Sequence, residues 1–535
     1  MPKKLLALLL LILTLAALWG IADRENSLPH LSELYTDRET MDAIIAHREA
    51  HDFTDVYTPM YTGLRFNGYD LFEDAGRGML LYSLIENDPR AWDPQVEIVS
   101  MKGAKMLAAG EKISDEMIRE NGAIDVLIYT DSEYALFELR LTTLPVIAID
   151  RNPASITARH KTVMRLFDNR AEAVNHLYTT DLMIWMRGNH STIYPKKSYR
   201  LDLYDESLGR NIRKNHVSLL GLRTDEDWIL HAMYNDPEKV REILSTNLWY
   251  DSSAGNNQWN IPNGVQYRYV EVFFDGTYWG VYALGSPVDA KQLAMQPDEH
   301  FYKKLDPYKP ESIIDFDAEG PVDAYQYLGM DELNPDWEPL KRYYRTVLDE
   351  NATAESLYQA ADADNAIDLY LFLNLIQGVD HAHLYGQDGV YNLYMAAKKT
   401  ASGTSMLYTP WDMDRTWGRG YDGEGPLSPE ENVVIDSSIV TRLLDMGDQE
   451  MIRRVKERYQ ELRTTLWSDE AMLGRIRTYE EQMFLSGAYE REYDRWYTQP
   501  DAMIRFDPAA SLDDFADYAL KRLACLDQFI EDITE

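Results

Sequence analysis

The sequence SMLYTPWDMDRTWG, residues 405–418, is a strand that runs into an acidic loop and ends at a glycine. The loop carries two carboxylates at positions i and i+2, Asp412 and Asp414. Carboxylate oxygens in this arrangement can hold a hard cation such as Mg²⁺. The same spacing is found in metal-dependent glycosyltransferases and in many ordinary turns. Taken alone, the stretch therefore leaves a metal site, a glycosyl-transfer site and a plain turn open.

The segment just upstream supplies further polar groups. We predict a hairpin in which a strand at 391–396 pairs with the strand at 405–409 through a turn at Gly403. The first of these strands contains Asn392. Asp380 and Asp388 precede it, and an aspartate followed by an asparagine can supply a base and a metal ligand. His381 and His383 form a His-x-His pair that could bind zinc, although no third ligand has recognisable spacing.

Two more polar clusters lie in the first half of the chain. Arg187 begins a turn-rich loop, and Lys196 and Lys197 then enter a strand, where an amine could reach a phosphate group. Further on, Asn235-Asp236-Pro237 has the residue types of a helix start and predicts a helix over 238–251. Read separately, each cluster is explained as well by surface polarity or helix capping as by binding.

Charge and composition limit the classes of function. The chain has 535 residues with 53 Lys and Arg against 89 Asp and Glu, a net charge of −36. Such an acidic surface repels phosphate backbones, so we expect no nucleic-acid partner. Any nucleotide site must then be a local island of positive charge, built from basic side chains or divalent cations. The one cysteine, Cys525, excludes an internal disulfide.

The N-terminus has the pattern of an export signal. Lys3 and Lys4 precede a run of mostly Leu, Ile and Ala up to Ala22. This is a basic segment followed by an apolar one. Its length lies between that of a cleaved signal peptide and that of a spanning helix, so residues 1–22 are a signal or a membrane anchor. We expect an exported protein, extracellular or at the cell surface, with membrane anchoring only through residues 3–22.

The remaining chain predicts an α+β layout. Residues 23–143 are predicted to form a small antiparallel β-sandwich-like accessory domain, with a partly helical segment up to about residue 53 and short strand-like runs over 56–143. Strands continue through 144–293, where Asp275-Gly276 is a strong hairpin signal. From 294 to 535 the pattern is mainly helical, apart from the strand pair around Gly403. A β-rich half followed by a helical half is typical of α+β folds.

Together, the ordered motifs resemble the CotH kinase family, which is named for a spore-coat protein. Its members show an Arg-Gly-Asn/Ser-x-Ser loop, a Lys-Lys-Ser-Tyr strand, an Asn-Asp-Pro helix start with an arginine shortly after, a Tyr-Trp-Gly-Val-Tyr hairpin and Pro-Trp-Asp-x-Asp. This chain has all five in order, at 187–191, 196–199, 235–241, 278–282 and 410–414. The resemblance covers about residues 144 to 466.

The resemblance implies an atypical bilobal protein-kinase-like domain, with a β-rich N-lobe at 144–293 and a helical C-lobe at 294–535. It implies a kinase that uses ATP with Mg²⁺ or Mn²⁺ to phosphorylate Ser or Thr hydroxyls of a secreted or surface protein. By the same resemblance, the nucleotide phosphates would contact Lys196, Lys197 and Arg187. The metal ligands would be Asp412, Asn392 and Asp414, and the catalytic aspartate would be Asp380 or Asp388, with Asp380 preferred because it directly follows a helix-like segment.

Two departures from the family pattern leave an alternative open. Gly285-Ser286-Pro287 follows the hairpin where relatives usually carry an acidic step, and Glu242 stands where an uncharged polar residue is common. ATP is also scarce outside cells. A catalytically weak or inactive scaffold in a cell-surface or extracellular assembly is therefore the second hypothesis.

Overall fold

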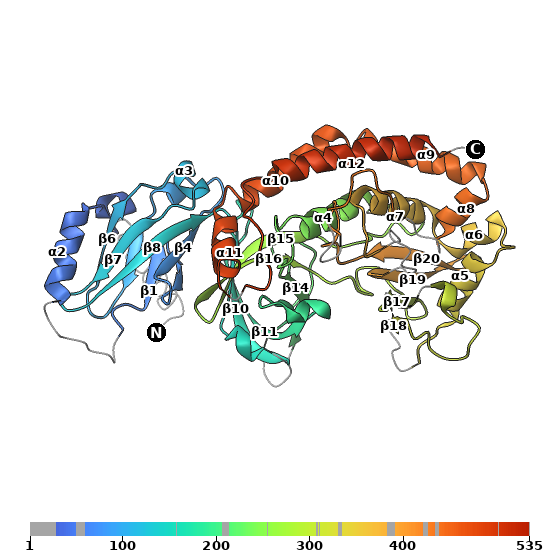
Figure 1. Ribbon diagram of the computed structural model, residues 1–535. Coiled ribbons are helices and arrows are strands. Elements are labelled where there is room, and N and C mark those ends of the chain that lie inside the picture. The colour runs from blue at the N-terminus through green and yellow to red at the C-terminus, as the bar shows by residue number, and fades with distance from the viewer. Residues whose placement is uncertain are drawn as a thin grey trace, which may run out of the picture. The chain divides into compact units, whose positions relative to one another are not determined.

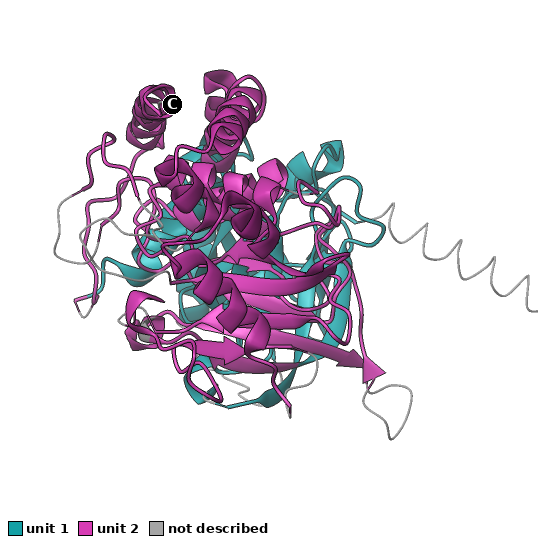
Figure 2. Cartoon of the chain, turned by 90° about the vertical axis from the view of Figure 1, so that its right-hand side faces the viewer, with its two compact units in different colours: residues 1–182, 270–281, 482–499 teal, residues 183–269, 282–481, 500–535 magenta. Residues whose placement is uncertain are grey.

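The computed structural model describes residues 28–49, 59–156, 158–205, 213–253, 255–306, 309, 311–329, 334–381, 391–420, 426–433, 438–500 and 502–533 (Figure 1). The chain forms two compact units, and neither is continuous in sequence (Figure 2). Unit 1 comprises residues 1–182, 270–281 and 482–499, and unit 2 comprises 183–269, 282–481 and 500–535. Strands β11 (Leu177–Arg187), β15 (Tyr267–Phe274) and β16 (Thr277–Gly285) contribute residues to both.

Unit 1 begins with two small sheets over a shared apolar core. A three-stranded sheet has the order β2-β1-β5, and a five-stranded sheet has the order β3-β4-β8-β7-β6. Phe66 and Val96 of the first sheet belong to the same buried cluster as Leu80, Val126 and Leu139 of the second. The strands are β1 (Gly63–Phe66), β2 (Tyr69–Asp70), β3 (Phe72–Asp74), β4 (Met79–Ser83), β5 (Val96–Val99), β6 (Lys105–Gly110), β7 (Ile124–Tyr129) and β8 (Tyr134–Thr142).

One pairing in this region differs from the antiparallel expectation, because β4 and β8 run parallel. The chain leaves β4, passes through β5, β6 and β7, and returns in β8, which pairs antiparallel with β7. The longer route gives β8 the same direction as β4, as a parallel neighbour requires a crossover connection. The helical segments of this part are η1 (Leu31–Leu34), α2 (Arg38–Glu49), η2 (Pro89–Trp92) and α3 (Asp115–Arg119).

Unit 1 also contains a helix from near the end of the chain, α11 (Ala488–Trp496). The Arg491 guanidinium donates to both carboxylate oxygens of Glu271, at 2.9 and 2.7 Å, and both residues are buried. The Tyr278 hydroxyl donates to Glu271 at 2.6 Å. Nothing in the local sequence predicts this placement. The remaining elements of unit 1 are β9 (Val146–Ile149), η3 (Pro153–Ser155) and β10 (His160–Phe167).

Unit 2 starts with the strands β12 (Ser198–Asp205), β13 (Arg213–Lys214) and β14 (Asp227–His231), preceded by η4 (His190–Ile193). Strand β14 pairs antiparallel with β12, Tyr199 opposite Leu230, and with the end of β16, Ile229 opposite Gly285. Helix α4 (Arg241–Ser253) follows β14. It begins three residues later than the predicted Glu238, because Lys239 has a left-handed φ of 61° and belongs to a turn.

The second sheet of unit 2 has the order β18-β17-β19-β20. The hairpin of β19 (Leu393–Thr400) and β20 (Gly403–Pro410) is confirmed, with Leu393 opposite Pro410 and Thr400 opposite Gly403. Strands β17 (His300–Lys304) and β18 (Tyr325–Tyr327) were not predicted and lie in the part of the chain expected to be helical. Each is only a few residues long, so neither provides a clear alternation of apolar and polar residues.

The helices confirm the α+β class. They are α5 (Glu338–Leu348), α6 (Ala354–Ala360), α7 (Ala363–Ile376), α8 (Ile439–Asp445), α9 (Gln449–Arg463), α10 (Asp469–Met483) and α12 (Asp513–Glu531), with a short η5 (Glu311–Ile313). Gly447, with a φ of 66°, separates α8 from α9. No helix among the described residues is long and apolar enough to cross a bilayer. The predicted signal or anchor, residues 1–22, lies outside the described residues.

Candidate metal centre and active site

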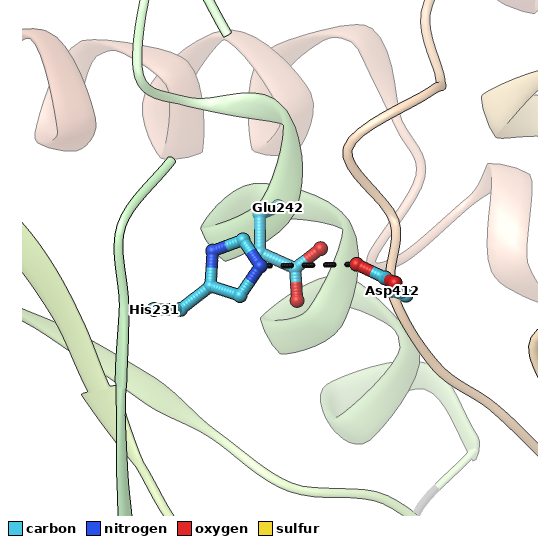
Figure 3. Close-up of side chains that lie close together, drawn as sticks. All are labelled: His231, Glu242 and Asp412. Carbon is cyan, nitrogen blue, oxygen red and sulfur yellow. Dashed lines mark ion pairs between the residues drawn. The ribbon is translucent and has the colours of Figure 1, made fainter. Parts of the chain in front are cut away.

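Three side chains from distant parts of the sequence converge in unit 2. His231 is the last residue of β14, Glu242 is the second residue of α4, and Asp412 follows β20. One ligand atom from each lies within 4.8 Å of the others. In Figure 3 the imidazole and the two carboxylates point toward one another, and the His231 Nε2 to Asp412 Oδ1 distance is 3.7 Å. The arrangement could hold a metal ion.

The start of α4 is fixed by a dense set of hydrogen bonds. Asp236 accepts from the backbone N–H of Arg241 at 2.8 Å and from its guanidinium at 2.7 Å. The buried Lys239 ammonium donates to the carbonyls of Met233 and Asp236, at 2.9 and 2.8 Å. The bond from the Arg241 N–H satisfies a donor that a helix start leaves unpaired, and the Lys239 bonds hold the turn that precedes the helix. As a result, Glu242 is held at a defined position in the first turn.

The acidic loop after β20 is joined to that same turn. The backbone N–H of Met413 donates to Glu242 Oε2. The Arg241 Nε donates to the Thr416 carbonyl at 3.1 Å, and the Trp417 indole donates to Ser245 Oγ at 2.9 Å. Glu242 and Asp412 are therefore positioned by one connected network that links α4 to the loop.

The hairpin brings Asn392 to the same place. The backbone N–H of Trp411 donates to the Asn392 carbonyl at 3.0 Å, one step beyond the Leu393–Pro410 pair. Asn392 and Asp412 both have left-handed backbones, with φ of 51° and 66°. Asn and Asp tolerate this region better than other side chains, and such conformations gather at functional sites. The backbones of Asn392 and Asp412, two of the predicted metal ligands, thus lie at neighbouring positions at the end of the hairpin.

The titration of the three groups reflects their mutual charges. Burial raises the pKa of Glu242 to about 7, and the Asp412 and Asp414 carboxylates add to this, against the effect of His231. Burial alone would lower the pKa of His231, but Glu242 and Asp412 outweigh it and raise the value. Burial would raise the pKa of Asp412, yet His231, with two more distant cations, holds it near 2. The site thus gathers negative charge that a cation would offset.

Two basic side chains add positive charge around Asp412. Arg187 lies over the Trp411 ring, with its guanidinium carbon 5.2 Å from the centroid, and Lys303 lies over the Tyr394 ring at 5.3 Å. After His231, their charges contribute to the lowered pKa of Asp412. Arg187 was predicted near the phosphates and does lie beside the acidic loop. Lys303, on the unpredicted strand β17, was missed.

Lys196 and Lys197 stand at the start of β12, next to the end of β14. Ser198 Oγ accepts from the Ala232 N–H at 2.9 Å, which fixes this neighbourhood. The buried Lys196 ammonium lies 4.5 Å from the centroid of the Tyr282 ring. Lys197 donates to the carbonyls of Thr192, at 2.6 Å, and Tyr194, and burial lowers its pKa. The structure thus places the lysines near His231, while the Lys197 ammonium is bonded to its own loop.

The other predicted residues are distributed around the acidic loop. Asp414 accepts from the Asn235 amide at 2.5 Å, and burial and the neighbouring Asp412 raise its pKa. Asp380 Oδ2 lies 3.7 Å from Arg415 Nε. Asp388 lies outside the described residues. The structure therefore places one of the two candidate catalytic aspartates beside the loop and does not describe the other.

His381 has a structural contact that accounts for one of its nitrogens. Its ring is fully buried, and Nε2 donates to the Trp411 carbonyl at 2.8 Å. Burial lowers the pKa of His381 to about 4, so the ring is neutral. His383 lies outside the described residues, so the His-x-His zinc alternative stays a prediction.

Gly285, in the segment that departs from the family pattern, has a packing role. A Cβ at this position would overlap the Tyr267 ring. The buried Tyr267 ring in turn lies 6.3 Å from the His231 ring and 6.4 Å from Trp411. A glycine here allows an aromatic ring to pack directly beneath the converging side chains.

The donor set fits a divalent cation. Glu242 is fully buried, and its Oε1 has no hydrogen-bond partner among the described residues. A buried polar atom without a hydrogen-bond partner is costly, and a bound cation at this position would satisfy it. The Asp412 side chain is 42% exposed, which leaves one side of the site open to a ligand. Two carboxylates and an imidazole are common ligands of divalent metals.

Sequence reasoning missed His231 and Glu242 as site residues. His231 lies just before Asn235-Asp236-Pro237, where only a helix start was recognised, and Glu242 was noted only as a departure from the family pattern. The useful signal was that departure, because an acidic residue in the first turn of a buried helix is costly unless something pairs with it. The spacing along the chain gives no indication that β14, α4 and the acidic loop meet.

Comparison with known proteins gives a consistent family match. The family model described as CotH kinase protein matches residues 184–526, well over half of the chain. Inner spore coat protein H of Bacillus subtilis (strain 168) is 23% identical over 332 residues, covering 61% of this chain and 84% of that protein. The matched region contains all three converging residues.

Proposed function

Because the chain belongs to the CotH kinase protein family, we propose that it is a phosphotransferase that moves the γ-phosphoryl group of ATP to Ser or Thr hydroxyls of a protein. The proposal includes dependence on Mg²⁺ or Mn²⁺. The observation that carries it is the convergence of His231, Glu242 and Asp412, with ligand atoms within 4.8 Å of one another, beside an open face.

Phosphoryl transfer requires positioning and neutralisation of charge more than covalent chemistry by the protein. A divalent ion held by His231, Glu242 and Asp412 would offset the negative charge of the phosphate groups. Arg187 and Lys303 would supply further positive charge at the same open side, since both lower the pKa of Asp412 through their charges. They provide the local positive island that a chain of net charge −36 needs in order to bind ATP.

The acceptor hydroxyl must lose its proton as its oxygen attacks phosphorus and the bond to ADP breaks. Asp380 is a reasonable base, because it stands next to the acidic loop and its side chain is partly exposed. Asp388 remains the alternative. The Asn392 carbonyl accepts from the N–H of Trp411, the residue before Asp412, and Asp414 follows Asp412 by two residues. Both side chains would complete the ligand set or orient its members.

The same proposal includes the finer architecture. We assign an accessory domain at 23–143, a kinase-like N-lobe at 144–293 and a helical C-lobe at 294–535. Support comes from the order β14, α4, β16 and then the hairpin with the acidic loop, in which Glu242 of α4 lies close to Asp412. The export pattern of residues 1–22, and a relative named for the inner spore coat, support a secreted or surface location.

A second function is favoured by one observation. The Lys197 ammonium is bonded to loop carbonyls, and Lys196 lies on an aromatic ring, so neither contact is with the acidic loop. If neither lysine reaches a phosphate, the protein serves as a weak or inactive scaffold. In that case nucleotide neither binds nor shifts the melting temperature, and partner binding is the same after Asp412→Ala.

Labelled ATP distinguishes the two functions. The full-length chain is incubated with γ-labelled ATP and Mn²⁺ or Mg²⁺, and incorporation into itself and into Ser-rich proteins is scored. The control is Asp412→Ala, which removes a proposed ligand. Incorporation that depends on Asp412 supports the kinase, and equal incorporation in both proteins would refute it. Variants Asp380→Asn and Asp388→Asn then show which aspartate is the base.

A further inference from the structure

We infer that His231 is a metal ligand, and that His231, Glu242 and Asp412 form a mixed nitrogen and oxygen site which selects Mn²⁺ or a similar transition ion over Mg²⁺. The inference deepens the proposed function, since it names the ion and rests on that function for its purpose. The metal site itself can be tested without any nucleotide.

The geometry allows one ion to contact all three groups. Two ligands that each lie about 2.1 Å from a metal are about 3 to 4 Å apart, depending on the angle between them. The distance from His231 Nε2 to Asp412 Oδ1 is 3.7 Å, and the largest separation in the set is within 4.8 Å. A contraction of less than about an ångström would seat the ion. The nitrogen faces both carboxylates (Figure 3).

Burial and pairing point to a ligand rather than to an ordinary ion pair. In the described part of the chain, no lysine or arginine forms an ion pair with Glu242 or Asp412. Glu242 is fully buried with one unpartnered oxygen, and a buried carboxylate of this kind needs a cation or a proton. The exposed part of Asp412 leaves coordination positions for water or phosphate, as catalytic metal sites do.

The nitrogen donor decides the class of ion. Mg²⁺ prefers oxygen ligands in a near-ideal octahedron and retains its waters. Imidazole instead favours transition ions, and affinity for such mixed sites rises along the first row from Mn²⁺. A glutamate held by the Met413 N–H and a histidine fixed at the end of a strand also give a defined arrangement.

The competing explanation is that His231 is a protonated cation that simply neutralises the two carboxylates. It predicts that Mn²⁺ binding, if present, involves oxygen ligands alone. Electron spin-echo spectroscopy of the Mn²⁺-loaded full-length chain separates the two, because a directly bound imidazole gives a ¹⁴N coupling. The coupling is the expected result in the wild-type protein. Its absence, or the absence of bound Mn²⁺, would overturn the inference without depending on any variant.

Titrations of the metal-free chain with Mn²⁺ and with Mg²⁺ provide the second test. His231→Gln should weaken Mn²⁺ binding by at least about tenfold and Mg²⁺ binding by much less, so that the preference for Mn²⁺ is lost. The matched control is His300→Gln. His300 lies 3.6 Å from the single carboxylate of Asp336, within unit 2, and belongs to none of the candidate metal clusters. Equal loss of both ions in His231→Gln would contradict the selectivity.

The outcomes distinguish this inference from the proposed function. Selective Mn²⁺ binding with a nitrogen coupling, but without phosphoryl transfer, would support the metal site and refute the proposed kinase function. Phosphoryl transfer with unchanged Mn²⁺ binding in His231→Gln would retain the kinase and remove the histidine ligand. Melting curves recorded in chelator show whether each variant is folded before metal is added.

Discussion

An acidic cluster lies at each end of strand β14, and the two clusters differ in how many basic side chains pair with their carboxylates. Before its first residue, Asp225 and Glu226 are almost fully buried and closely paired with basic side chains. Asp225 contacts Arg223 at 2.5 Å and Lys291 at 2.6 Å, and Glu226 contacts Lys214 at 2.5 Å. At the last residue, the ion pair given for Asp412 is with His231 at 3.7 Å, and Glu242 has no ion pair within the described residues, although its carboxylate lies within 4.8 Å of both.

Both clusters could hold a metal ion by the positions of their ligand atoms, so geometry alone does not separate them. Pairing does. The first cluster is already neutralised by the protein, and a metal there would have to displace lysine and arginine. Each cluster has one buried carboxylate oxygen without a hydrogen-bond partner among the described residues, Glu226 Oε2 in the first and Glu242 Oε1 in the second. Glu226 Oε2, however, lies 2.8 Å from His216 Nδ1 in an ion pair, whereas the second cluster has no Lys or Arg partner among the described residues and its Asp412 side chain is 42% exposed. Acidic groups that the protein leaves unpaired in a buried place indicate function, since stability would favour pairing them.

The largest expected difference between the two clusters is in activity. We expect Asp412→Ala to lower phosphoryl transfer by about a thousandfold, because it removes electrostatic stabilisation of the transferring group. Asp225→Asn should leave the rate per folded molecule within about twofold, since its partners are structural. Both are measured with γ-labelled ATP on protein corrected for its folded fraction. A similar loss of phosphoryl transfer in Asp412→Ala and Asp225→Asn would contradict the assignment of activity to the Asp412 cluster.

Stability should show the reverse pattern. Asp225→Asn is expected to lower the free energy of unfolding by about 1 to 3 kcal/mol, because it weakens the pairing of a buried carboxylate with the partly exposed Arg223 and Lys291 and its acceptance from the Glu226 and Asp227 N–H groups. Asp412→Asn should change it by less than about 1 kcal/mol without metal, since the loss of the long 3.7 Å pair with His231 is offset by the loss of repulsion with Glu242 and Asp414. Urea unfolding followed by circular dichroism measures both.

Metal binding should act at one end of β14 only. At a hundredfold excess over its dissociation constant, Mn²⁺ adds about 2.7 kcal/mol to stability, which corresponds to a few degrees in melting temperature. Asp412→Ala should abolish the shift, and Asp225→Asn should retain it. A chelator should reverse it in the wild type. A shift that survives Asp412→Ala and disappears in Asp225→Asn would move the metal site to the other cluster.

The smallest effect is a pH dependence at the paired cluster. Burial would raise the pKa of Glu226, but Lys214 and Lys291 outweigh it and hold the value at about 2. A folded pKa below the unfolded one contributes stability above the ordinary value, near pH 4.3, and this is lost as pH falls toward 2. The stability gap between wild type and Glu226→Gln should therefore narrow by about half or more between pH 5 and pH 2.5. Thermal melts across that range measure the gap, and a constant gap would contradict the pairing.

Local patterns predicted the elements that surround the site. The turn at Gly403 and the alternation on either side predicted the hairpin of β19 and β20, and that hairpin alone brings Asn392 opposite Trp411. The helix start at Asp236 was placed within a few residues, since Asp and Pro there have local preferences. The offset arose from Lys239, whose side chain bonds to carbonyls before the helix begins.

The sequence by itself therefore determined the α+β class, the family motifs and the acidic loop, because turns, caps and periodicity act over a few residues. Only the tertiary structure decided that His231 and Glu242 meet Asp412, and that α11, from the end of the chain, belongs to unit 1 with Glu271. Such contacts join residues far apart in the chain. They depend on which buried faces pack together, and the spacing of residues along the chain does not predict that packing.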